Sequence, residues 1–174
     1  MSQQPMTQLQ ILQENLADLR KIAGWTMEVM AGKLGVSKQT VSNLEAQKVK
    51  LSRVQYIAIR AILECEMSAK PSNTTLPRVL GLILDTGGAW YAAHREQLRT
   101  TVTAIASIAA AGVGDLSLHA GATALLAPLG AVCSVPRRHG GEPSLQWLTG
   151  LLNETGDAQN ETEELENENG QAGV

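Results

Sequence analysis

Two short segments near the start of the chain carry apolar residues at helical spacing and are separated by a glycine. Thr26 is a suitable N-cap for the first segment, and Ser37 for the second. The apolar positions that would face a core are Met27, Met30, Ala31, Leu34, Val41 and Leu44. Gly35 follows the first segment directly, as a left-handed C-cap requires. The pattern therefore predicts two helices joined by a tight turn over residues 26–45.

Apolar residues also recur at helical spacing on both sides of this pair. The stretch 9–23 predicts a first helix that ends near Gly24, and the stretch 54–63 predicts a later helix that Ser52 can cap. Together these segments predict an all-α fold whose first domain spans residues 6–68.

The second half of the chain differs in composition. Residues 69–76 are polar and turn-forming, which is typical of a linker. Residues 77–152 form an Ala/Gly-rich apolar helical region, with one long helix predicted over 89–111 and a further apolar stretch over 116–135. Residues 153–174 are rich in Glu, Asn, Gln and Gly and are predicted to be a disordered acidic tail.

The outer face of the second helix in the 26–45 pair is made of hydrogen-bonding side chains. Its residues are Lys38, Gln39, Thr40, Ser42 and Asn43, and this stretch contains no carboxylate. Such a face suits the base edges and phosphates of DNA. The short loop that follows, residues 46–51, adds Lys48 and Lys50.

These features resemble a known family, the Cro/phage-repressor or Xre-type helix-turn-helix regulators, over residues 16–63. The motif reads Leu19-Arg20, Trp25-Thr26, Met30-Ala31, Leu34-Gly35-Val36-Ser37, Val41-Ser42 and Leu44-Glu45. The resemblance implies a lambda-repressor-like bundle in which the helix that begins near Ser37 is the recognition helix.

The resemblance also assigns roles to single residues. Positions facing bases or flanking phosphates are occupied by Lys38, Gln39, Thr40 and Asn43. Arg20 and Glu45 match a structural ion pair of the family. Three features depart from the pattern: Met27 stands where glutamine is frequent, Ala46-Gln47 replaces a pair that ends in glycine, and the following loop lacks its usual proline.

Charge is divided unevenly along the chain, which hides a basic segment within a net charge of −3. Residues 16–63 hold eight Lys and Arg and three Asp and Glu, a balance of +5. Residues 142–174 hold eight acids and no Lys or Arg. A basic head of this kind fits a phosphate backbone, and we expect Lys38, Lys48, Lys50 and Arg53 to contact phosphates. Sequence preference would then come from Gln39, Thr40 and Asn43.

Small residues recur through the apolar stretch 104–132, which permits close helix approach. Two interpretations compete: a helical hairpin that packs on a second copy and forms a homodimer, or a segment that inserts in a membrane. The default alternative to both is a soluble helical core with no special ligand. Arg137 and Arg138 flank the stretch and are compatible with the membrane interpretation.

No catalytic motif supports an enzyme, and neither a metal site nor a cofactor site is predicted. Every lysine lies at or before Lys70, so a Ser–Lys protease pair cannot form within the second half. Cys65 and Cys133 are interpreted as buried small residues of a cytoplasmic protein.

The sequence thus predicts a sequence-specific, DNA-binding transcriptional regulator, a repressor that binds double-stranded DNA as a dimer on a palindromic operator. The alternative is a membrane-tethered or protein-interaction adaptor that retains the helix-turn-helix fold.

Overall fold

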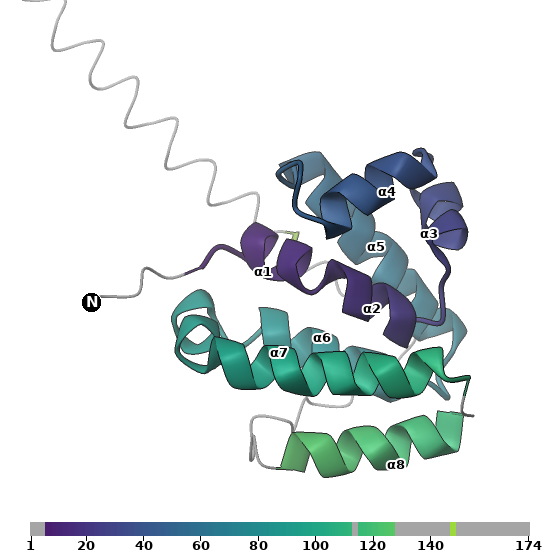
Figure 1. Ribbon diagram of the computed structural model, residues 1–174, viewed down its shortest axis with the longest axis vertical. Coiled ribbons are helices and arrows are strands. Elements are labelled where there is room, and N and C mark those ends of the chain that lie inside the picture. Colours follow the sequence, from purple (N-terminus) through teal and green to yellow (C-terminus); the bar gives the residue numbers. More distant parts are fainter. Residues whose placement is uncertain (1–5, 113–114, 128–146, 149–174) are drawn as a thin grey trace, which may run out of the picture. The chain divides into compact units, whose positions relative to one another are not determined.

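The computed structural model describes residues 6–112, 115–127 and 147–148. Within these ranges the ordered elements are eight α-helices, in agreement with the all-α prediction (Figure 1). Their bounds are α1 Gln8–Glu14, α2 Leu16–Ile22, α3 Met27–Leu34, α4 Lys38–Glu45, α5 Arg53–Ala69, α6 Thr75–Leu84, α7 Gly88–Ala110 and α8 Asp115–Leu126. All eight lie in one compact unit that spans Met1–Gly141. The remainder of the 116–135 stretch, Cys133 and the tail 153–174 lie outside the described residues.

The helix starts follow from side-chain capping. The hydroxyl of Thr26 accepts a hydrogen bond from the backbone N–H of Val29 (3.2 Å), and that of Ser37 accepts one from Thr40 (3.1 Å). Ser52 caps α5 in a reciprocal arrangement with the side chain of Gln55. Each cap satisfies a backbone donor that has no partner inside its helix, which is why these three starts were predictable from the sequence.

The single first helix predicted over residues 9–23 is wrong, because the structure divides it at Asn15. The Asn15 side chain is buried, and its Nδ2 donates to the carbonyl of Ile11 (2.8 Å) and to the hydroxyl of Tyr91 (2.7 Å). A side-chain amide that bonds to the backbone one turn earlier competes with the regular helical ladder. The same side chain also ties the junction of α1 and α2 to α7, 76 residues away.

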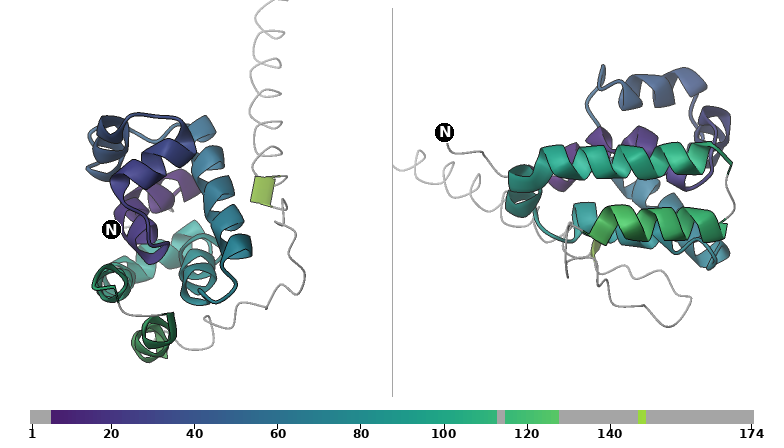
Figure 2. Two further views of the ribbon diagram at one scale, coloured as in Figure 1. Left: turned by 90° about the vertical axis from the view of Figure 1, so that its right-hand side faces the viewer. Right: turned by 60° about the horizontal axis from the view of Figure 1, so that its bottom comes forward.

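Helices α6 and α7 pack on the face of α1 and α2 that lies away from the α3–α4 pair, and α8 packs on α6 and α7 (Figures 1 and 2). Helix α6 is buried along most of its length, with Leu76, Val79, Leu82 and Ile83 fully enclosed. Helix α7 lies along α2, and α8 lies against α7. The α3–α4 pair and α8 thus occupy opposite sides of the α1–α2 layer.

The loop between α5 and α6 is tied to α2. Nδ2 of Asn73 donates to the carbonyl of Ile22 (3.0 Å), and Oδ1 of Asn73 accepts from the backbone N–H of Leu76 (3.1 Å).

The predicted division into a domain 6–68, a linker 69–76 and a region 77–152 stays a prediction.

A ladder of polar side chains joins α7 to the α1–α2 layer. Its members stand four residues apart on one face of α7: Tyr91, Arg95, Arg99 and Thr103. The Tyr91 hydroxyl donates to Glu14 (3.1 Å), and Nε of Arg95 donates to both carboxylate oxygens of Glu14 (2.9 and 3.1 Å). Further along, the Thr103 hydroxyl donates to Asp18 (2.7 Å). The Glu14 side chain is only 5% exposed, so its charge depends on these donors.

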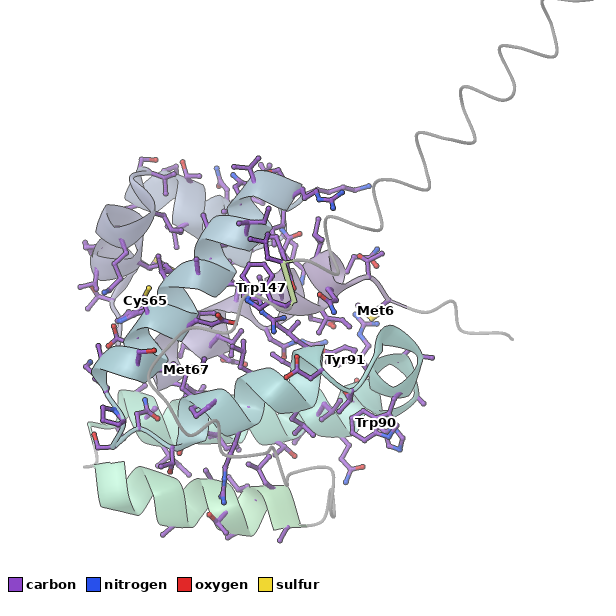
Figure 3. The ribbon with its side chains drawn as sticks, turned by 180° about the vertical axis from the view of Figure 1, so that it is seen from behind. Met6, Cys65, Met67, Trp90, Tyr91 and Trp147 are labelled. Atoms are coloured by element: carbon purple, nitrogen blue, oxygen red, sulfur yellow. The ribbon has the colours of Figure 1, made fainter. Side chains whose placement is uncertain are left out.

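One expectation about a surface residue changes. Cys65 is exposed on α5, so its interpretation as a buried small residue is wrong (Figure 3). Among the described residues, the exposed large apolar residues are Val29, Val49 and Val54, all of which lie before α6. The helices that the structure describes include none with the length and apolar character needed to cross a membrane.

Tyr91 is the buried member of the ladder, and Figure 3 shows it at the first turn of α7. Tyr91→Phe should lower the free energy of unfolding by about 1–2 kcal/mol, because one amide hydrogen of the buried Asn15 loses its acceptor. Thr103→Val removes an exposed hydrogen bond of the same ladder and should change stability by less than about 0.5 kcal/mol. Urea denaturation of both variants measures the difference, and equal losses would contradict the assignment.

The free energy of unfolding of the wild-type protein and that of Tyr91→Phe should also depend differently on pH. Burial raises the pKa of Tyr91 from 10.0 to about 12, because the phenolate is poorly solvated in the bundle. A raised pKa contributes stability that is complete below pH 10 and is lost as the pH rises through about 12. The difference in free energy of unfolding between the wild-type protein and Tyr91→Phe should therefore become smaller as the pH rises from 10 to about 12.

Candidate nucleic-acid interface

The α3–turn–α4 unit is held by an apolar seam. Of the six apolar residues predicted to face a core, Met30 and Ala31 of α3 and Val41 and Leu44 of α4 are buried. Met27 and Leu34 are half-buried. Gly35 adopts the left-handed conformation (φ 66°) between the helices, and the N–H of Val36 closes the turn on the carbonyl of Ala31 (3.0 Å). The seam leaves the opposite side of α4 facing outward.

A buried ion pair fixes the end of α4 against α2. Nε of Arg20 lies 2.5 Å from Oε1 of Glu45, and Nη2 lies 3.2 Å from Oε2. Nη1 of Arg20 also donates to the carbonyl of Trp25 (2.8 Å), so the guanidinium joins three segments. The fork geometry is specific to arginine, and removing either partner would leave a buried charge uncompensated.

Gln13 also holds the end of α4 and the loop that follows it, and no pattern in the sequence identified this residue. Its Nε2 donates to the carbonyls of Leu44 (3.1 Å) and Val49 (2.6 Å), and its Oε1 accepts from the backbone N–H of Leu51 (2.9 Å). One side chain on α1 thus holds both ends of the 46–51 loop. The partners are more than thirty residues away and are backbone groups, so no local pattern could have indicated them.

The outward side of α4 carries the predicted DNA-contacting residues. Lys38 and Gln39 are exposed, whereas Thr40, Ser42 and Asn43 are half-buried. Nε2 of Gln39 donates to Oδ1 of Asn43 (3.0 Å), which places these two amides side by side at i, i+4 spacing. Free donors and acceptors remain on both amides, as recognition of an adenine edge would need.

The basic loop lies beside this helix. Lys48 and Lys50 are exposed, and Arg53 is half-buried in the first turn of α5. The structure therefore brings the predicted phosphate-contacting residues of the loop next to α4, through the hydrogen bonds that Gln13 makes to both ends of the segment.

The stretch 38–43 on the outward side of α4 contains no carboxylate, but a carboxylate from α3 lies beside it in the structure. Glu28, in the first turn of α3, forms an ion pair with Lys38, the first residue of α4. Hydrogen bonds from the Lys38 ammonium, from the backbone N–H of Glu28 and from the Thr26 hydroxyl lower the pKa of Glu28 to about 2. The carboxylate is therefore ionised at neutral pH and lies at the edge of the predicted interface.

The end of α4 contains a strained residue. Gln47 has a φ of 56° and is the sole residue other than glycine with a positive φ in the described ranges. Its N–H bonds to the carbonyl of Leu44 (3.1 Å), and the N–H of Lys48 bonds to that of Asn43 (2.9 Å), which is a Schellman motif. The equivalent positions after α2 and α3 are Gly24 and Gly35.

Gln47→Gly should raise the free energy of unfolding by about 1 kcal/mol, since relief of the left-handed penalty exceeds the extra chain entropy of glycine. Ala46→Gly is the matched control, because Ala46 has an ordinary φ of −78°. It should destabilise by about 0.5–1 kcal/mol. Denaturant midpoints test both, and a loss of stability in both variants would contradict the strain at position 47.

Comparison with known proteins agrees with this geometry. Residues 16–68 match the family model described as "Helix-turn-helix". No curated protein and no solved structure gives a significant match to the chain. The matched segment is a helix-turn-helix of the Cro/C1, Xre-like type, the resemblance that the sequence motif indicates, and such a domain is characteristic of DNA-binding transcription regulators. The match ends within α5 and does not cover α6 to α8.

Proposed function

We propose that this protein is a transcriptional repressor that binds a palindromic operator as a homodimer, in the cytoplasm. The observation that supports this proposal most directly is the outward side of α4. Its polar side chains project from a helix whose other side is packed, and the basic 46–51 loop lies next to it. A rigid helix with amide and hydroxyl groups beside a basic loop fits a major groove and its flanking phosphates.

The assignment of roles follows from side-chain chemistry. Gln39 and Asn43 can form paired hydrogen bonds with adenine, and Thr40 and Ser42 can donate to or accept from base edges or phosphates. Lys38, Lys48, Lys50 and Arg53 would neutralise phosphates and supply most of the sequence-independent affinity. Because only these last contacts release counterions, salt dependence separates the two groups of residues.

The dimer is proposed from the size of the site. One recognition helix reads only a few base pairs, and helix-turn-helix proteins double this footprint by binding two half-sites about one helical turn apart. Occupancy of such a site at a promoter would block transcription. The alternative role, a protein-interaction adaptor, would leave the polar side of α4 without a nucleic-acid ligand.

A genome-wide DNA footprint of the full chain tests the proposal. We expect protected sites with two inverted half-sites, whose centres lie about 10 base pairs or a multiple of that apart. Protection of single, asymmetric sites would contradict the dimer, and the absence of any protected site would favour the adaptor.

On an operator identified in this way, two substitutions should behave differently. Gln39→Ala should cost about 1–3 kcal/mol of binding free energy and relax base preference at one or two positions. Lys48→Ala should weaken binding to all sequences alike and reduce the salt slope by about one unit. Titrations at several salt concentrations measure both quantities.

Two control variants lie away from this surface. Gln97→Ala removes an exposed amide from α7, and Lys70→Ala removes an exposed charge next to the end of α5. Neither should alter base preference. If Gln39→Ala and Lys48→Ala match their controls, α4 and its loop are not the DNA-binding surface.

A further inference from the structure

Glu28 and Lys38 form the one ion pair that lies at the edge of the proposed DNA surface among the ion pairs of the described residues. Both side chains are largely exposed, at 61% and 60% respectively. They bring the first turn of α3 to the first turn of α4, which is the end of the recognition helix expected to contact DNA most closely. The lysine predicted to neutralise a phosphate therefore already has an anionic partner within the chain.

Glu28 lies in the first turn of α3, two residues after its N-cap Thr26. The Thr26 hydroxyl accepts a hydrogen bond from the backbone N–H of Val29 (3.2 Å), which fixes the turn that carries Glu28. Lysine ammonium groups are among the donors that hold DNA phosphates, so the Glu28 carboxylate takes the place of a phosphate oxygen at Lys38. This contact forms within the chain and does not require DNA.

The other carboxylate within α3 and α4 has a different role. Glu45 is paired with Arg20 and its side chain is only 7% exposed, so it contributes little charge to the outer surface. Glu28 is therefore the acidic group of these two helices that DNA phosphates would meet.

We propose that Glu28 acts as an internal substitute for a DNA phosphate at Lys38 and limits the affinity of the protein for DNA of any sequence. This inference rests on the proposed function, since it concerns the same surface. While Lys38 is paired with Glu28, the two charges cancel and the pair neutralises no phosphate. Binding must exchange the carboxylate for a phosphate, and the freed carboxylate then lies close to the DNA backbone and opposes binding.

The consequence for specificity follows from the type of contact that Glu28 weakens. Phosphate contacts are the same at every site, whereas the contacts of Gln39 and Asn43 depend on the bases. A loss confined to the phosphate term lowers the affinity for cognate and non-cognate DNA by the same factor and leaves base discrimination intact. Glu28 is accordingly a residue that limits affinity, and it shortens the time that the protein stays bound at any one non-cognate site.

The test compares the full chain with Glu28→Gln, using a short mixed-sequence DNA duplex as the probe and fluorescence anisotropy at several salt concentrations. Glutamine preserves size and removes the charge. We expect Glu28→Gln to bind about threefold more tightly near physiological salt and to steepen the salt slope by about one unit, the effect of one additional phosphate contact. Glu96→Gln is the matched control, because it makes the same change in net charge on α7, on the other side of the α1–α2 layer.

A second pair of variants assigns the effect to Lys38. In a Lys38→Ala background, Glu28→Gln should leave the salt slope nearly unchanged, because no ammonium is released, and any remaining gain in affinity reflects only the removal of the carboxylate's repulsion. An equal steepening of the salt slope with and without Lys38 would overturn the proposed exchange, and so would equal gains from Glu28→Gln and Glu96→Gln. Circular dichroism of each variant verifies that the helical content is unchanged.

The two proposals fail in different ways. If the wild-type chain binds the duplex and Glu28→Gln binds it with the same affinity and salt slope, the role of Glu28 is wrong while DNA binding stands. If neither protein binds DNA at any salt concentration, both proposals are wrong. If only Glu28→Gln binds, the role of Glu28 is supported in its strongest form.

Discussion

Three consecutive side chains at the junction of α1 and α2 hold the rest of the structure in place. Gln13 bonds to the end of α4 and to the 46–51 loop, whereas Glu14 and Asn15 bond to Tyr91 and Arg95 of α7. Successive residues on a helix point in different directions, so one short segment contacts elements on both sides of the α1–α2 layer. The DNA-facing unit and the C-terminal helices are therefore positioned by the same few residues.

The helix-turn-helix was predictable because its determinants are local. Thr26, Ser37 and Ser52 cap helices within three residues of their own position, and Gly35 terminates α3 where the apolar stripe ends. The apolar seam of Met30, Ala31, Val41 and Leu44 then follows from helical periodicity alone. The Arg20–Glu45 contact could be anticipated through family resemblance, although its 25-residue separation gives no local signal.

The features that escaped prediction depend on distant partners. Tyr91, Arg95, Arg99 and Thr103 stand at regular four-residue spacing, yet nothing in that spacing identifies Glu14 and Asp18 as the groups they meet. The break at Asn15 was not predicted either, because an isolated asparagine in an apolar pattern is equally compatible with a continuous helix. Glu28 was visible in the sequence, but its place beside Lys38 depends on how α3 and α4 cross.

The strain at Gln47 shows a further limit of sequence patterns. In the family that the sequence resembles, the pair at positions 46 and 47 ends in glycine, whereas this chain has Ala46-Gln47. The structure retains the Schellman geometry and places a glutamine in the left-handed position. Backbone geometry at this turn is evidently determined by the packing of α4 and by the hydrogen bonds from Gln13, and the residue adapts to it.

The position of Gln13, Glu14 and Asn15 also determines where the chain could be cut to isolate the helix-turn-helix unit. The segment that matches the helix-turn-helix family begins at residue 16, immediately after these three residues. A cut at that boundary would remove α1 with the buried Ile11 and Leu12, and would release the basic loop from its only clamp on α1 among the described contacts. The unit recognised by sequence similarity is thus smaller than the unit that packs as one body. Chimaeras that transplant this DNA reader should therefore take their first junction before α1.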